Sequence, residues 1–139
     1  MKELSKVLIL LFIVLMGTAS CGDEPDGSWE KMKWTNATNL MNVNGVYILP
    51  AEGGSCSFLC RNYSHPWISS VEVNGVYQAV DSENPLVFNG EWFTLKFEGN
   101  NLIITAEPLP ESVQSRSFKL DVTAGDIFDH FVFSQQRNT

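Results

Sequence analysis

The feature that most constrains the fold is the alternation of apolar and polar residues along two segments. In residues 93–97 and 118–122, every second side chain is apolar and its neighbours are polar. Successive side chains of a strand point to opposite faces, so this pattern predicts strands with one buried face. Six further segments are expected as strands, namely 46–49, 55–61, 67–73, 86–88, 102–106 and 127–135. Many short strands separated by turn-forming residues are typical of an all-β sandwich or a barrel.

A pentapeptide, Val-Asn-Gly-Val-Tyr, occurs at 43–47 and again at 73–77. Asn-Gly between β-branched and aromatic residues favours a tight hairpin turn, because both central positions of a type I′ turn need a positive φ. Five residues repeated once are too few to indicate a duplicated module. We interpret the repeat as the same turn chemistry used twice.

The N-terminus has the organisation of a secretory signal. Two lysines precede an uncharged apolar run, Val7 to Met16, which is too short to span a membrane as a helix, and small residues follow it. The stretch Ala19-Ser20-Cys21 resembles the lipobox of bacterial lipoprotein signal peptides, although Thr18 replaces the usual leucine. The resemblance implies a signal peptide over 1–20 and a lipid on Cys21 that anchors the protein without spanning the membrane. The alternative is ordinary signal cleavage nearby, with Cys21 incidental.

An acidic, glycine-containing stretch follows at 22–28 and has the composition of a flexible tether. It is similar to the export signal that sends some lipoproteins of Bacteroidetes-type bacteria to the outer face of the outer membrane; a plain solvated spacer is the alternative. The formal net charge of the 139 residues is −7, and it becomes −8 for the 119 residues left after cleavage. This balance argues against nucleic acid or an anionic membrane surface as a partner. We expect an outer-membrane, lipid-anchored protein.

Two cysteines, Cys56 and Cys60, stand four residues apart in one expected strand. Their Cα atoms would be roughly 13 Å apart, beyond the ~7 Å that a disulfide tolerates. The spacing is also not one that zinc sites use. His65, before a proline, is expected as a solvated turn residue, and the other histidine, His130, is distant in sequence. We expect both cysteines to act as apolar core residues and expect neither a metal nor a cofactor.

Several motifs in order along the chain resemble the BACON domain family. They are the Gly53-Gly54 turn, the strand that ends near Asn62, Trp67, the strand that starts at Arg116, and a last strand that ends in Gln135. The resemblance covers roughly residues 45–136 and implies an immunoglobulin-like β-sandwich of about seven to eight strands. It also implies carbohydrate or mucin binding.

This chain departs from the family pattern by an insertion at 74–85 and by lacking the usual attached catalytic module. We expect 21–44 to be a lipidated tether with a Trp-containing segment, and 45–139 to be the sandwich.

Glycan binding requires exposed aromatic rings beside polar groups, because sugars present apolar C–H faces and hydroxyl rims. The candidates are Tyr63, Trp92, Trp34 and Trp29; turns favour exposure of Tyr63 and Trp92. Trp67 is expected in the core.

No nucleophile, metalloprotease, P-loop or dinucleotide motif occurs, and no spacing singles out a carboxylate pair among Glu72, Glu91, Glu98 and Asp129. We expect no catalytic residue. Three hypotheses remain: a surface lipoprotein that binds a glycan or glycoprotein, a structural or protein-interaction module without glycan affinity, and a hydrolase. They predict, respectively, exposed rings, an exposed apolar patch or strand edge, and two facing carboxylates.

Overall fold

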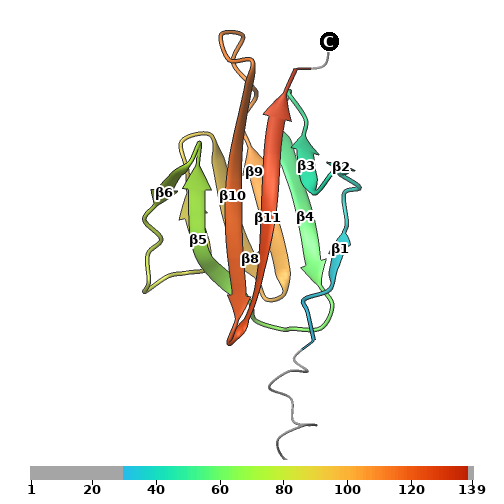
Figure 1. Cartoon of the computed structure of the whole chain (residues 1–139), viewed down its shortest axis with the longest axis vertical. Helices are drawn as coiled ribbons and strands as arrows, with labels where there is room; N and C mark the ends of the chain where they lie inside the picture. The colour runs from blue at the N-terminus through green and yellow to red at the C-terminus, as the bar shows by residue number, and fades with distance from the viewer. Residues whose placement is uncertain (1–29, 138–139) are drawn as a thin grey trace, which may run out of the picture. The chain divides into compact units, whose positions relative to one another are not determined.

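The computed structural model describes residues 30–137, and within this range the chain forms eleven strands and no helix (Figure 1). The strands are β1 (Trp34–Asn36), β2 (Met41–Val43), β3 (Val46–Leu49), β4 (Gly54–Cys60), β5 (Trp67–Val73), β6 (Val76–Gln78), β7 (Val87–Asn89), β8 (Phe93–Glu98), β9 (Asn101–Ala106), β10 (Ser115–Ala124) and β11 (Ile127–Gln136). No helix in this part of the chain is long and apolar enough to cross a membrane.

The strands form two sheets that pack as an immunoglobulin-like β-sandwich, which confirms the expected fold class. One sheet has five strands in the order β1-β4-β9-β8-β7, and the other has six in the order β2-β3-β11-β10-β5-β6. Neighbours are antiparallel except β3 and β11, which are parallel. Figure 1 looks onto the six-stranded sheet, with β10 and β11 at its centre and the five-stranded sheet behind.

The expected count of about seven to eight strands is too low. All eight expected segments form strands, and the three that were missed are β1, β2 and β6. Each has three residues, which is too short to display an alternating pattern. Both Asn-Gly turns form as expected: they join the hairpins β2–β3 and β5–β6, and all four turn residues have positive φ.

The core lies between the sheets and is built from the alternating segments. Phe93, Leu95 and Phe97 of β8 are buried, and so are Phe118 and Leu120 of β10. The rings of Phe93 and Phe118 stack in parallel across the sandwich, with centroids 3.8 Å apart and planes inclined by 4°. This contact joins the two strands whose alternation was clearest in the sequence.

The cysteines of β4 face this core, as expected. Cys56 and Cys60 are exposed by 4% and 0%, and both are free thiols. Burial raises the pKa of the Cys56 thiol to about 12, so the reactive thiolate is disfavoured in the folded protein.

The expectation that Trp67 belongs to the core is wrong. Strict alternation back from Val73 and Val71 would turn Trp67 inward, but β5 pairs with β10 through a register shift between Asp121 and Val122. This bulge inserts one extra residue and reverses the faces of the strand before it. Ile68 therefore points into the core, while Trp67 is 37% exposed on the outer face.

Gly53 permits a close backbone approach that places the loop before β4 against the segment after β9. Its φ is +81°, and a Cβ atom here would lie 2.7 Å from the Ala106 carbonyl oxygen and 2.8 Å from the Pro108 nitrogen. Gly45 has a similar φ of +88° but no atom within 4 Å of the same position. A comparison of substitutions at Gly53 and Gly45 therefore separates the cost of backbone strain from the cost of steric clash.

Gly53→Ala is expected to lower the free energy of unfolding by about 3 kcal/mol, because both strain and backbone clash oppose the new methyl group. Gly45→Ala should cost about 1 kcal/mol from strain alone. Urea denaturation of both variants measures the difference. Equal losses would show that the loop moves aside without cost.

Candidate functional site

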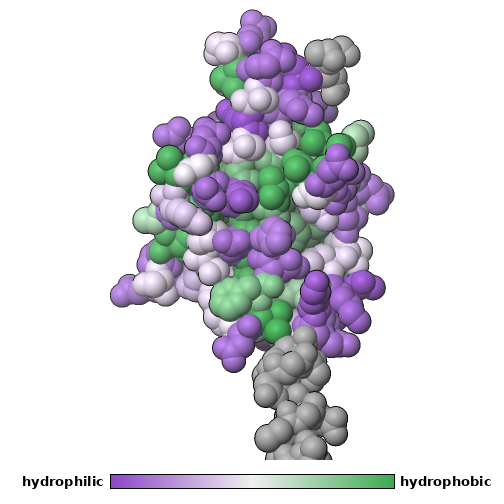
Figure 2. Space-filling view, viewed as in Figure 1, coloured by the Kyte–Doolittle hydropathy of each residue, from purple (hydrophilic) through white to green (hydrophobic). Residues whose placement is uncertain are grey.

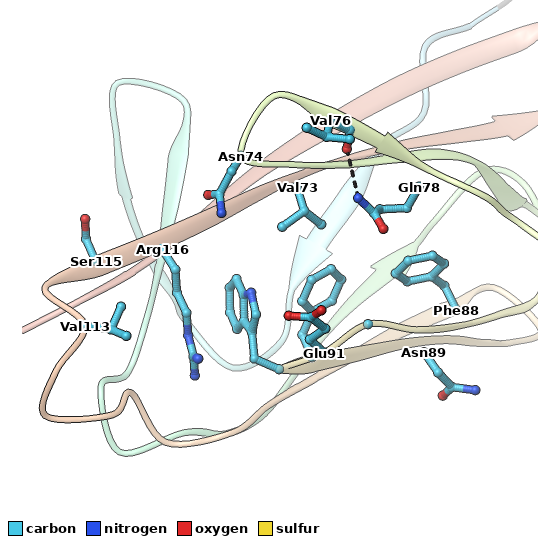
Figure 3. A pocket seen from close by; sticks show the side chains of 13 residues that line it. Val73, Asn74, Val76, Gln78, Phe88, Asn89, Glu91, Val113, Ser115 and Arg116 are labelled. Atoms are coloured by element: carbon cyan, nitrogen blue, oxygen red, sulfur yellow. Dashed lines mark hydrogen bonds between the residues drawn. The ribbon is translucent and has the colours of Figure 1, made fainter.

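A pocket of about 580 Å³ opens between the edges of the two sheets, at the end of the sandwich where β5 ends and β8 begins (Figure 3). We call this end the pocket end. The lining residues are Val73, Asn74, Val76 and Gln78 from the β5–β6 hairpin, Phe88 to Phe93 from β7 and its turn, and Val113, Ser115 and Arg116 from the start of β10 and the loop before it. Figure 3 shows Val73 and Asn74 on one side of the opening and Phe88 on the other, with Asn89 at the outer margin and its side chain pointing away.

Trp92 lies in this pocket, but the expectation that it is exposed is wrong, since it is 7% exposed. Its ring meets Phe93 and Phe118 edge-on, with centroids 4.9 and 5.4 Å apart. The backbone around it is fixed because the Gly90 amide donates to the Phe93 carbonyl and the Glu107 amide donates to the Trp92 carbonyl. This turn folds over the end of the sandwich, so its tryptophan closes the core there.

Arg116 covers the Trp92 ring from the loop side. Its guanidinium carbon is 4.3 Å from the ring centroid, within the range of a cation–π contact. Burial lowers the pKa of the Arg116 guanidinium and the nearby Glu107 carboxylate raises it, and arginine remains charged at neutral pH. The pocket therefore has a positive group held flat against an aromatic ring.

A buried glutamine holds Arg116 in this position. Gln135, which is 0% exposed, accepts a 2.7 Å hydrogen bond from Arg116 Nε through Oε1. Its Nε2 donates to the Pro50 and Glu107 carbonyl oxygens at 2.9 and 2.8 Å. Arg116 Nη2 also donates to Glu107 O and to Pro108 O at 3.1 Å. Four segments of the chain are thus joined beside the pocket.

The rim of the pocket is polar, while its floor is apolar. Asn74, Asn89 and Glu91 are exposed lining residues, and within residues 30–137 their side chains form no hydrogen bond or ion pair with the protein. Gln78 Nε2 donates to the Val76 carbonyl oxygen at 3.2 Å. Aromatic residues beneath, including Phe88 and Phe93, are buried. An apolar floor with a few converging polar groups is the usual make-up of a small-ligand site.

The same lining gives no catalytic pair. Glu91 is the single carboxylate among the lining residues, whereas a glycosidase requires two that face each other. Within the described residues, no group of three or more His, Cys, Asp or Glu side chains is placed to hold a metal. The geometry supports binding.

The other aromatic candidates lie away from the pocket. Trp34 is half-buried; its Nε1 donates to Asp129 Oδ2 at 2.9 Å, and its ring meets Phe131 edge-on at 5.0 Å. Tyr63 is half-buried and packs against the core. Trp29 and the lipidation candidate Cys21 lie outside the described residues. The structure does not bring Tyr63, Trp92 and Trp34 together.

The polar residues of the pocket were missed at the sequence level. Asn74 and Asn89 looked like turn residues and nothing more, because both stand next to glycine. Arg116 and Gln135 belonged to the motifs that carry the BACON resemblance, and their hydrogen bond gives that pairing a physical reason.

The fold is a β-sandwich of the immunoglobulin-like class, and the candidate site is a pocket with an apolar floor and a polar rim. A protein from Bacteroides thetaiotaomicron, solved by NMR, is 37% identical to this chain and superposes with a TM-score of 0.68. The match covers 84% of this chain and 95% of that one, and the chain therefore belongs to the same family as that protein. The M1 domain from titin matches with 9% identity and a TM-score of 0.46, over 76% of this chain and 93% of that one. No protein-family model and no curated protein matches the chain.

Proposed function

We propose that this protein is an exported, lipid-anchored, non-catalytic module that binds a glycan or glycoprotein in the pocket beside Trp92. The observation that carries the proposal is the pocket lining. Its floor is aromatic, its rim offers the unpaired side chains of Asn74, Asn89 and Glu91, and Arg116 is held at one side. Sugar rings combine apolar C–H faces with hydroxyl groups, and these lining groups complement both.

The described chain enters the sandwich far from the pocket. Asn62 binds the first described part of the chain: its Nδ2 donates to the Lys31 carbonyl, and its Oδ1 accepts from the Lys33 amide. Asn62 follows β4, whose last residue is Cys60, and the pocket lies at the end where β4 begins. The chain therefore joins the sandwich at the end opposite the pocket.

The test is a glycan and mucin array probed with the soluble form, residues 22–139, and with an Asn89→Ala/Glu91→Ala variant. Both side chains lack partners among residues 30–137, so the variant should keep its melting temperature and lose binding at least about tenfold. The matched control is Glu83→Ala/Gln136→Ala, which removes two equally polar, exposed side chains outside the pocket lining. A blank array from the folded protein, or equal binding by both variants, would contradict the proposal.

A second candidate function, a protein-interaction module of a surface complex, is favoured by one observation. Met41 and Val43 of β2 are 66% and 46% exposed at an open edge of the six-stranded sheet. Figure 2 shows hydrophobic surface over β2 and β3. A partner strand or apolar partner surface would cover such an edge. A blank glycan array together with a partner captured by wild type and lost in Met41→Lys would favour this function.

A further inference from the structure

A second surface with the chemistry of a ligand site lies on the outer face of the six-stranded sheet. Trp67 at the start of β5 and Phe128 near the start of β11 are 37% and 67% exposed. Both are in register with Thr123 of β10, one on each side. Val122, the neighbour of Thr123, is buried in the core, so Thr123 and its two partners face outward. We call Trp67, Thr123 and Phe128 the aromatic ledge.

The two rings of the aromatic ledge flank Thr123, one on each side. Thr123 is only 5% exposed although it points away from the core. Its hydroxyl turns aside to donate to the Gly125 and Ile127 carbonyl oxygens at 2.8 and 3.0 Å. The Thr123 hydroxyl is therefore used within the β10–β11 hairpin. Figure 2, which looks onto this face, shows a hydrophobic area near the lower ends of β10 and β11.

Polar groups occupy the next row of the same face. Ser70, Asp121 and His130 are in register across β5, β10 and β11. The Ser70 hydroxyl donates to Asp121 Oδ2 at 2.7 Å, and His130 is exposed. A hydroxyl, a carboxylate and an imidazole thus run parallel to the ledge, one row away along the strands.

We propose that the aromatic ledge binds an extended neutral polysaccharide laid across the strands. Trp67 and Phe128 are separated by two strand spacings, roughly 10 Å. A flat chain of sugar rings places apolar C–H faces on both aromatic rings and directs hydroxyl groups to the polar row. A neutral chain avoids repulsion from Asp121 and from the net charge of −7.

The surroundings argue against two other occupants. Two rings bordered by Asp121, Asp126 and His130 offer much less apolar area than the roughly 800 Å² per partner of a stable dimer, and two copies of charge −7 repel each other. The same carboxylates repel an anionic lipid surface. A neutral polysaccharide requires neither a large apolar area nor positive charge.

The inference rests on the proposed glycan-binding function for the class of ligand, and on a different surface for the site. Trp67 begins β5 and Val73, which lines the pocket, ends it, so the ledge and the pocket lie at opposite ends of that strand. Variants at one site leave the other intact, which allows the two proposals to fail separately.

The experiment is affinity electrophoresis of the full chain in a polyoxyethylene detergent, through gels that contain mixed-linkage β-glucan, xyloglucan or galactomannan. Wild type should be retarded by at least one, and Trp67→Ala/Phe128→Ala should bind that polysaccharide about tenfold more weakly. Asn89→Ala/Glu91→Ala reports on the pocket in the same gels. Tyr77→Ala is the matched control, because Tyr77 is 71% exposed on the same sheet and outside the ledge and the pocket.

Each outcome decides the matter. If retardation is lost in the ledge variant and kept in Tyr77→Ala, the result supports the ledge as the binding site, whatever the result for the pocket variant. No retardation of wild type by any of the three polysaccharides, or retardation that the ledge variant keeps in full, overturns the ledge and leaves pocket binding to be judged by the array. A further control uses vesicles of phosphatidylethanolamine and phosphatidylglycerol with protein whose tether has been cleaved. If cleaved wild type binds these vesicles and the cleaved ledge variant does not, the polysaccharide proposal is overturned in favour of a lipid surface.

Discussion

Phe118→Ala is expected to lower the free energy of unfolding by about 4 kcal/mol, the largest effect of any single substitution considered for this protein. Phe118 is 1% exposed and its ring stacks on Phe93 at 3.8 Å and on Phe133 at 5.0 Å. Alanine would remove the ring that joins the two sheets and leave a cavity between β8, β10 and β11. Urea denaturation followed by tryptophan fluorescence measures the loss, because the Trp92 ring contacts Phe118 edge-on.

Phe128→Ala is the matched control for this substitution. It removes the same side chain from the outer face of the neighbouring strand, where Phe128 is 67% exposed. Its cost should stay below about 1 kcal/mol. Similar losses in the two variants would mean that the stack between the sheets contributes no more than surface packing does.

Gln135→Leu is expected to cost about 3 kcal/mol of unfolding free energy. Leucine fills a similar volume but offers no hydrogen bond, so the Pro50 carbonyl and Arg116 Nε lose a partner in the interior. Gln136→Leu is the control, since Gln136 is the exposed neighbour on the same strand, and it should change stability by less than about 0.5 kcal/mol.

Gln135→Leu should also alter the pocket, because Gln135 holds in place the Arg116 side chain that covers Trp92. A double-mutant cycle of Gln135→Leu with Arg116→Ala is expected to show a coupling energy of roughly 1–3 kcal/mol. Strictly additive losses would show that Arg116 keeps its position on the ring without Gln135, and the network would then be only a feature of the core.

The pocket is lined by groups that reach one place from distant parts of the sequence. Asn74 comes from a hairpin turn of one sheet, Asn89 and Glu91 from the end of β7 and the turn after it, and Arg116 from the start of β10. The turns are exposed and their side chains have no role in the core, so they are free to vary without loss of the fold. Differences in ligand among relatives of this protein should therefore appear at these turns.

Much of the fold could be predicted from the sequence because its signals are local. Alternation at 93–97 and 118–122 indicated the two strands that supply the central stack, and the Asn-Gly pairs indicated the two tight hairpins that form. Strand spacing alone kept Cys56 and Cys60 from bonding to each other. Each of these conclusions needs only a few neighbouring residues and the geometry of one strand or turn.

The tertiary structure decided what depends on pairing between distant segments. The bulge opposite Asp121 turned Trp67 outward and made it part of the aromatic ledge, although the pattern around it pointed inward. Trp92 follows a turn yet closes the core, because that turn folds over the end of the sandwich. Gly53, Arg116 and Gln135 were separate motifs in the sequence, and the fold brings them to the segment after β9. The sequence by itself determined which residues form strands and turns. Which side chains are exposed together was decided by strand register and by the packing of turns against one another, because register and turn packing depend on contacts between residues far apart in the chain.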